Sequence, residues 1–153
     1  MTPPAPACRI RSLEQGDRPG WDRLYQGYAE FYAVPQTPQM RDTVFAWLMD
    51  PSHECEGLVA EAEDGELLGL THFRPFASPL RAVTNCFLDD LFVTPEARGS
   101  GAAAALIQEV RRRASARGWK VVRWITADDN YRARGVYDRL ATRTGWITYD
   151  MAP

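Results

Sequence analysis

The sequence predicts an α/β (α+β) domain in which helices flank a mixed, mostly antiparallel sheet that ends in one parallel β-α-β unit. Strand-length apolar runs alternate with apolar stripes at helical spacing, in the order β-α-α-β-β-β-α-β-α-β. The consecutive strands in the middle predict an antiparallel meander. The later strand-helix-strand crossover predicts a parallel pair. With 153 residues, we expect a short disordered lead over 1–7 and a single domain over 8–153.

The first half of the chain predicts a strand, two helices and a hairpin. Pro19 shortly after Asp17 is a helix-start signal. Asp64-Gly65 between two apolar runs is a strong signal for a tight hairpin. The expected ranges are a strand over 8–14, a helix from 17 to 31, a short helix that ends before 51, and strands over 58–63 and 66–73.

The second half predicts alternating strands and helices. An apolar stripe that contains Leu106 and Val110 predicts a helix, and Gly118 ends it. The expected ranges are a strand over 83–93, a helix over 101–117, a strand over 120–125, a helix around 133–140 and a final strand over 146–149.

Composition excludes several classes of protein. No apolar run approaches the roughly 20 residues that a membrane-spanning helix needs, so we expect no membrane partner. Three scattered cysteines predict neither a disulfide framework nor a zinc site, which favours a reducing, cytoplasmic setting. Two histidines exclude a histidine-rich metal centre, so no metal is expected. A pI near 5.7 without a recognised basic module argues against a nucleic-acid partner.

Charge is unevenly distributed along the chain. Residues 42–90 hold ten acidic and two basic side chains, whereas 98–143 hold eleven basic and four acidic ones. The two segments therefore carry −8 and +7. This asymmetry suits a cationic ligand beside one segment and a polyanion beside the other.

A glycine-containing turn joins the strand over 83–93 to the following helix. Backbone N–H groups at a helix start have no intrahelical partners, and the helix dipole adds positive potential, so this turn predicts an anion site suited to phosphate. Gly99 and Gly101 permit close approach of a ligand to the backbone. The turn lacks the Gly-Lys-Ser/Thr of a nucleotide-triphosphate loop, and its place after a meander argues against a dinucleotide fold.

Three motifs resemble the GNAT superfamily of N-acetyltransferases. The run from Arg98 to Ala103 resembles the acetyl-CoA motif [RQ]-x-x-G-x-[GA], and the strand from Leu88 to Val93 is similar to the family's L-x-D-L-x-V strand. The run from Asn130 to Tyr137 resembles N-x-x-A-x-x-x-Y. Within the superfamily the chain looks most like the polyamine and histone acetyltransferase group, although Asp89 stands where polyamine enzymes often have Glu.

The resemblance implies that acetyl-CoA is the cosubstrate, and it assigns roles to individual residues. The cosubstrate positions are Leu91, Phe92, Val93, Arg98, Gly99, Ser100, Gly101, Ala102, Ala103, Ala104, Asn130, Ala133 and Tyr137. The acceptor positions are Tyr28, Glu30, Asp89 and Asp90. Among the strand residues 91–93, a backbone N–H would stabilise the oxyanion, and the tyrosine would lie beside the sulfur.

Two residues are expected to carry the proton transfers. An alkylamine is mostly protonated at neutral pH, so a carboxylate must take a proton from it, directly or through a water. Asp89 and Asp90 are adjacent on a predicted strand and are therefore expected on opposite faces, and matching to the family makes Asp89 the base. Tyr137, two helical turns after Asn130 and on its face, is expected to protonate the thiolate.

The expected function is direct acetyl transfer to a primary amine, which we expect to be a small cationic amine such as a polyamine or an amino acid. A protein lysine or N-terminus is an alternative acceptor, and a non-catalytic acyl-CoA-binding protein is an alternative of a different class. We also expect a homodimer, because Trp146, Ile147 and Tyr149 form an apolar segment in a short tail and an exposed strand edge invites pairing.

Overall fold

Five strands form one sheet in the order β1-β2-β3-β4-β5, in a computed structural model that describes residues 8–153. All neighbouring strands are antiparallel except β4 and β5, which run parallel. The strands are β1 (Cys8–Ser12), β2 (Glu56–Ala62), β3 (Leu67–Ser78), β4 (Val83–Val93) and β5 (Val122–Arg123). The expected fold class and the parallel pair are confirmed.

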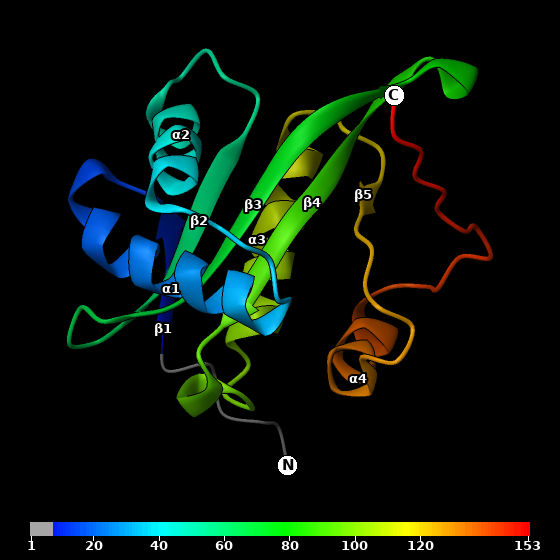
Figure 1. Cartoon of the computed structure of the whole chain (residues 1–153). Coiled ribbons are helices and arrows are strands. Elements are labelled where there is room, and N and C mark those ends of the chain that lie inside the picture. The colour runs from blue at the N-terminus through cyan, green and yellow to red at the C-terminus, as the bar shows by residue number, and fades with distance from the viewer. Residues whose placement is uncertain (1–7) are drawn as a thin grey trace.

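Helices cover both faces of this sheet, with α1 and α2 on one side and α3 on the other (Figure 1). Short 3₁₀ turns lie at Gln15–Asp17, Pro79–Arg81 and Pro95–Ala97. The helices are α1 (Arg18–Phe31), α2 (Pro38–Met49), α3 (Ala102–Ala116) and α4 (Tyr131–Leu140). Helix α4 stands beyond β5, away from the sheet's centre.

Each face of the sheet has its own apolar core. On what we call the α1/α2 face, Trp21 and Phe45 pack against sheet residues that include Leu70 and Phe92. On the α3 face, Leu106 and the rest of the apolar stripe of α3 pack against a second set of sheet residues. The sheet residues of the α3 face include Leu58, Ala60, Phe73, Cys86, Leu88, Leu91 and Val93.

The turn and cap signals of the sequence are confirmed. Asp17 precedes α1, and Pro19 occupies its first turn. Gly65 in the hairpin and Gly118 after α3 adopt φ values of 88° and 75°, in the left-handed region that favours glycine.

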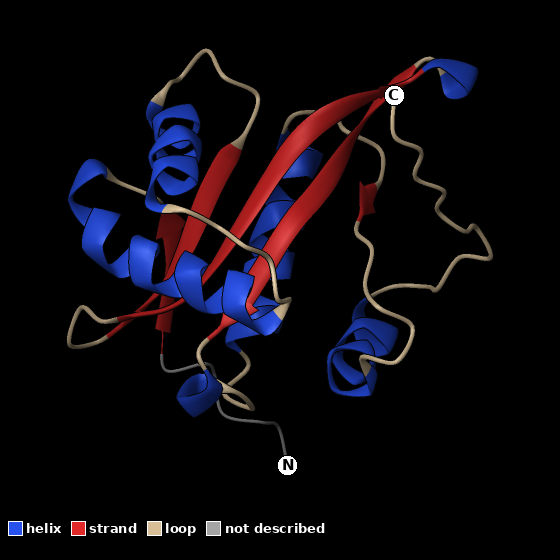
Figure 2. Ribbon diagram, in the orientation of Figure 1, coloured by secondary structure: helices blue, strands red, loops and turns tan. Residues whose placement is uncertain are grey.

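Several strand limits differ from those expected. Strand β1 ends at Ser12, because a 3₁₀ turn begins at Gln15. Strand β3 continues to Ser78, so that β3 and β4 form a long hairpin (Figure 2). Strand β5 has only two residues, because it pairs with β4 only at Cys86 and Phe87 and the two strands then diverge.

The expected final strand over 146–149 is wrong. The tail after α4 is coil, drawn as a tan trace in Figure 2. Trp146, Ile147 and Tyr149 are 87%, 74% and 86% exposed. A strand needs an edge with which to pair, and within residues 8–153 this segment pairs with no strand of the sheet.

No helix within residues 8–153 combines the length and the apolar character needed to cross a bilayer. The expected lead over 1–7 lies outside the described residues.

Candidate active site

A gap opens between β4 and β5 beyond Phe87. The last paired positions are Phe87 and Arg123, whereas β4 continues alone to Val93. Along β4, successive N–H groups point alternately to its two edges. Thr94 donates its N–H to the carbonyl of Leu68 at 2.8 Å, so the N–H of Val93 points the other way, into the gap.

The same alternation shows where the N–H groups of Leu91 and Phe92 point, the other two strand residues that were expected to bind the cosubstrate. Leu91 shares its side-chain face with Val93, and its N–H therefore also points into the gap. Phe92 points its N–H toward β3 and packs its ring on the α1/α2 face. The structure thus brings the N–H groups of Leu91 and Val93, and not that of Phe92, to the gap.

The glycine-containing loop from Arg98 to Gly101 has the backbone that its glycines predict. Gly99 and Gly101 have φ values of 83° and 88°, and Gly101 is the N-cap of α3. Ala103 and Ala104 lie in the first helical turn, where N–H groups have no intrahelical partner. Free backbone N–H groups therefore gather at the start of α3, where the helix dipole is positive.

The remaining loop residues have more local roles. The Ser100 hydroxyl accepts the N–H of Ala102 at 3.4 Å. Ala102 itself is buried against the α3-face core. The Arg98 guanidinium lies 5.6 Å from the ring centre of Phe31 at the end of α1, which holds this cation beside the loop.

A β-bulge in β4 overturns the expectation that Asp89 and Asp90 face opposite sides. His72 of β3 pairs with Asp90 and Phe73 pairs with Leu88, so Asp89 is the extra residue. Leu88 and Leu91 consequently both face α3, although residues three apart on a regular strand face opposite sides. The two aspartates between them both lie on the α1/α2 face.

Asp90 is the centre of a buried polar network. Its Oδ2 accepts a hydrogen bond from the Tyr25 hydroxyl at 2.9 Å and lies 2.8 Å from Nδ1 of His72. The Trp21 indole donates to Nε2 of His72 at 3.0 Å, so the hydrogen of this neutral imidazole is on Nδ1 and is donated to Asp90. Burial raises the pKa of Asp90, but the hydrogen bond and electrostatic attraction of His72 and the hydrogen bond from Tyr25 outweigh it and hold the pKa below its ordinary value.

Asp89 has a different environment from its neighbour. Both its oxygens accept from Nε of Arg74, at 3.2 and 3.0 Å. The Arg74 guanidinium in turn lies 5.2 Å from the ring centre of Phe87. Burial raises the pKa of Asp89, and Arg74 offsets only part of this effect. Asp89 is therefore the better proton acceptor of the two carboxylates, and Asp90 the more firmly charged one.

Tyrosines of α1 line the approach to these carboxylates. Tyr28 stacks with Tyr25 at 6.1 Å and meets Phe92 edge-on at 6.0 Å between ring centres. Burial and the nearby Asp90 raise the pKa of Tyr28, so the phenol stays neutral. The structure thus brings Tyr28 close to the aspartates, and its contact with the acceptor stays a prediction.

Glu30 is not part of this site. It is exposed on α1 and accepts a hydrogen bond from Gln26, one turn earlier, at 3.4 Å. The helical period puts it on a different face from Tyr28, so the structure does not bring Glu30 to the aspartates.

Tyr137 of α4 lies across the gap from α1. Its ring meets Trp124 edge-on at 5.4 Å, and burial, together with the nearby Tyr32, raises its pKa to about 12. The hydroxyl is therefore protonated at neutral pH and can donate a hydrogen bond. Asn130 caps α4 by accepting the N–H of Ala133 at 3.4 Å, so in this structure these two residues fix the start of the helix that carries Tyr137.

Much of the charge asymmetry seen along the sequence is neutralised in space. Glu56 of the acidic segment pairs with Arg117 of the basic one, Glu61 pairs with Arg11, and Asp42 with Arg18. The acidic character of the site consequently comes from Asp89 and Asp90 rather than from the whole segment. Among the described residues, no group of three or more His, Cys, Asp or Glu side chains is arranged to hold a metal ion.

Sequence reasoning missed Tyr25, His72 and Arg74. His72 and Arg74 are two apart on β3, which places both on the face of the aspartates. This signal was available, since both residues are polar within an apolar strand, but their partners depend on the bulge in β4.

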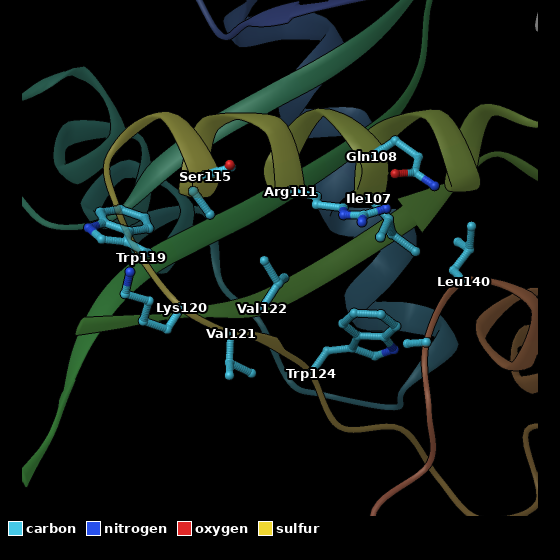
Figure 3. Close-up of a pocket in the computed structure, with 12 residues that line it drawn as sticks. Ile107, Gln108, Arg111, Ser115, Trp119, Lys120, Val121, Val122, Trp124 and Leu140 are labelled. Atoms are coloured by element: carbon cyan, nitrogen blue, oxygen red, sulfur yellow. The ribbon is translucent and has the colours of Figure 1, made fainter. Parts of the chain in front are cut away.

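A separate cavity of about 380 Å³ lies on the α3 face, between α3 and the outer side of β5 (Figure 3). Ile107 and Arg111 of α3 lie on one side of it, and Val122 and Trp124 on the other. Leu140 at the end of α4 closes one end. This cavity is not the site of the aspartates, which lie on the opposite face.

Comparison with known proteins identifies the family. The sequence pattern of the acetyltransferase (GNAT) family matches residues 21–141. The chain belongs to the GNAT acetyltransferase family. It is therefore an N-acetyltransferase that uses acetyl-CoA, and the free N–H groups of the loop and of β4 fit that cosubstrate.

Individual relatives agree with this assignment. The chain is 29% identical to the D-amino-acid N-acetyltransferase HPA3 of Saccharomyces cerevisiae, over 92% of this chain and 88% of that protein. It is 30% identical to the uncharacterized N-acetyltransferase YhfO of Bacillus subtilis, over 92% and 94%. A crystal structure of a probable acetyltransferase superposes with a TM-score of 0.83 at 26% identity, over 95% of this chain and 97% of the other.

Proposed function

We propose that this GNAT enzyme acetylates the primary amine of a small cationic acceptor, such as an amino acid or a polyamine, bound on the α1/α2 face. The observation that carries the proposal is the bulge in β4, which sets Asp89 and Asp90 side by side next to the gap. Two carboxylates there attract an ammonium ion, and neutral tyrosines form the adjacent wall.

The chain's own groups account for cosubstrate binding. The N–H groups at the start of α3 suit the pyrophosphate, and the N–H groups of Leu91 and Val93 suit the pantetheine amides and the oxyanion. Bound there, acetyl-CoA supplies an activated thioester. Arg98 supplies a positive charge beside the loop.

The two aspartates take different parts in this proposal. Asp90, kept charged by Tyr25 and His72, attracts the ammonium, and Asp89, whose pKa is raised, accepts its proton directly or through a water. Tyr137, protonated at neutral pH, donates to the departing sulfur.

The function is tested by following free thiol while the protein turns over acetyl-CoA with panels of polyamines, amino acids and lysine-containing peptides. We expect thiol release that depends on a small amine. Thiol release only with peptides would favour a protein acetyltransferase instead. Binding of acetyl-CoA without thiol release for any acceptor would contradict the proposal. The yeast relative is named as a D-amino-acid N-acetyltransferase, which supports including both enantiomers of each amino acid.

We also propose that the enzyme is a homodimer in which the C-terminal segment of one copy docks beside β5 of the other. In the described part of the chain, β5 pairs with β4 alone, which leaves its outer edge open beside the 380 Å³ cavity. The tail offers matching apolar groups, with Ile147, Tyr149 and Met151 alternating and 74–93% exposed.

Light scattering at micromolar concentration tests this assembly. We expect the mass of a dimer, and we expect removal of residues 146–153 to yield a monomer. Full-length protein with the mass of a monomer would refute the proposal.

A further inference from the structure

Arg74 uses only one of its three guanidinium nitrogens in hydrogen bonds to the described residues. Its Nε donates to both oxygens of Asp89, but neither Nη atom donates a hydrogen bond within the described residues. The side chain is 36% exposed, and its guanidinium is held over the ring of Phe87. The ring of Phe87 and the hydrogen bonds from Nε to Asp89 fix the plane of the guanidinium. The two Nη atoms, which we call the free fork, remain available to a ligand.

We infer that Arg74 binds the α-carboxylate of an amino-acid acceptor, which makes the acceptor a zwitterion rather than a polyamine. This inference rests on the proposed acetyl transfer to a small amine. The free fork matches a carboxylate, which guanidinium groups bind through two parallel hydrogen bonds. The site thereby gains a subsite for a negative group beside the two aspartates.

The arrangement of charges favours this class of acceptor. Arg74 and Asp89 are in contact, at 3.0 Å between Nε and Oδ2. An α-amino acid carries its ammonium and its carboxylate on one carbon, so it can lie against this ion pair with each charge facing its opposite. Its ammonium then faces Asp89 and Asp90, the groups proposed to deprotonate and attract it.

A polyamine fits the same charges less well. Its first ammonium can meet Asp90, but a further ammonium directed toward β3 would meet the Arg74 cation, and like charges repel. The other titratable groups near this point are His72 and Tyr25, which donate to Asp90, together with Tyr28 and Cys55. Burial raises the pKa of Cys55 to about 12, so this thiol stays neutral and adds no charge.

The test compares an amino acid with its own amide, which keeps the ammonium and removes the carboxylate. Thiol release is measured for both, in both enantiomers, and for a diamine of similar length. We expect the wild type to prefer the amino acid over the amide at least tenfold in kcat/KM, and to use the diamine least. In Arg74→Gln the preference should fall to about one. Loss of the Arg74 contact to Asp89 should slow the reaction of both acceptors, but activity on the amino acid should fall at least tenfold further than activity on the amide. Arg74→Lys should retain part of the preference, since it keeps the charge without the fork.

Arg117→Gln is the matched control. Arg117 is 39% exposed, pairs with Glu56 and lies 4.9 Å from the ring centre of Trp119, so it resembles Arg74 in exposure, pairing and stacking but is remote from the aspartates. Its substitution should leave the preference unchanged.

Two results would overturn the inference while leaving the proposed function intact. One is a wild type that uses the amide or the diamine as well as the amino acid. The other is an Arg74→Gln variant that loses activity on amino acid and amide alike, which would make Arg74 only a positioning residue for Asp89. Absence of thiol release by the wild type with every acceptor would overturn the proposed function and this inference together.

Discussion

Gly69→Ala should destabilise the protein and impair its activity together. Gly69 of β3 pairs with Val93 of β4, and a Cβ atom there would lie 2.8 Å from the carbonyl oxygen of Phe92. It would also lie 3.1 Å from Cγ2 of Val93 and 3.3 Å from Cδ1 of Leu106. The closest of these contacts is to backbone within the β3–β4 ladder, so relief requires β4 itself to shift.

The expected magnitude follows from overpacking. Insertion of a methyl group into a well-packed core typically costs 1–3 kcal/mol, so we expect a loss of about 2 kcal/mol in the free energy of unfolding. With a urea m-value of about 2 kcal/mol/M, the midpoint should fall by about 1 M. Because β4 presents the N–H groups of Leu91 and Val93 to the gap, we expect kcat to fall by about tenfold or more in the folded variant.

Gly57→Ala is the control for this prediction. A Cβ atom at Gly57 of β2 would have its nearest contacts at 3.4 Å from side-chain carbons of Leu13 and Leu48, an ordinary packing distance. We expect its unfolding midpoint to equal or exceed that of the wild type, because alanine restricts the unfolded chain. Urea unfolding followed by tryptophan fluorescence measures both variants, and a Gly69→Ala midpoint equal to that of wild type would refute the reasoning.

Four further predictions concern the site. Trp21→Phe leaves Nε2 of the buried His72 without a donor and should lower the free energy of unfolding by about 1–3 kcal/mol in urea titrations. Gly101→Glu puts bulk, charge and a strained φ at the helix start, so calorimetry should find acetyl-CoA affinity reduced at least tenfold, or about 1.4 kcal/mol. Tyr137→Phe should keep acetyl-CoA binding while kcat falls roughly ten- to hundredfold, and equal losses of both would make the hydroxyl a binding contact. Asp90→Asn should be less stable than wild type at pH 7, and since the folded pKa of Asp90 lies below its ordinary 3.8, this difference should shrink as pH falls below about 4.

Local signals in the sequence predicted the backbone of the glycine-containing loop well. Gly99 and Gly101 are required by backbone φ values that other residues rarely adopt, and such a requirement can be recognised without knowledge of the rest of the fold. The hairpin at Gly65 was predictable for the same reason.

The arrangement of the two aspartates could not be predicted in this way. Period-two alternation places Asp89 and Asp90 on opposite faces, and only the pairing of His72 with Asp90 and of Phe73 with Leu88 reveals the extra residue. A bulge is a property of two strands together, so one strand's residue pattern does not reveal it.

The final strand failed as a prediction for a related reason. Ile147 and Tyr149 have strand propensity, but a strand forms only where it can pair with a sheet edge. Within residues 8–153 this segment pairs with no sheet edge. The sequence likewise overstated the negative charge of residues 42–90, because Arg117 and other arginines distant in sequence form ion pairs with that segment.

The most direct test of the account is the pH dependence of kcat/KM for thiol release, measured for the wild type and for Asp89→Asn. We expect the wild-type rate to fall on the acid side with a pKa above the ordinary 3.8 of an aspartate, as Asp89 takes up a proton. Asp89→Asn should lose that acid limb and turn over about a hundredfold more slowly at neutral pH. An Asp89→Asn variant that keeps both the wild-type rate and the acid limb would contradict the claim that Asp89 deprotonates the acceptor.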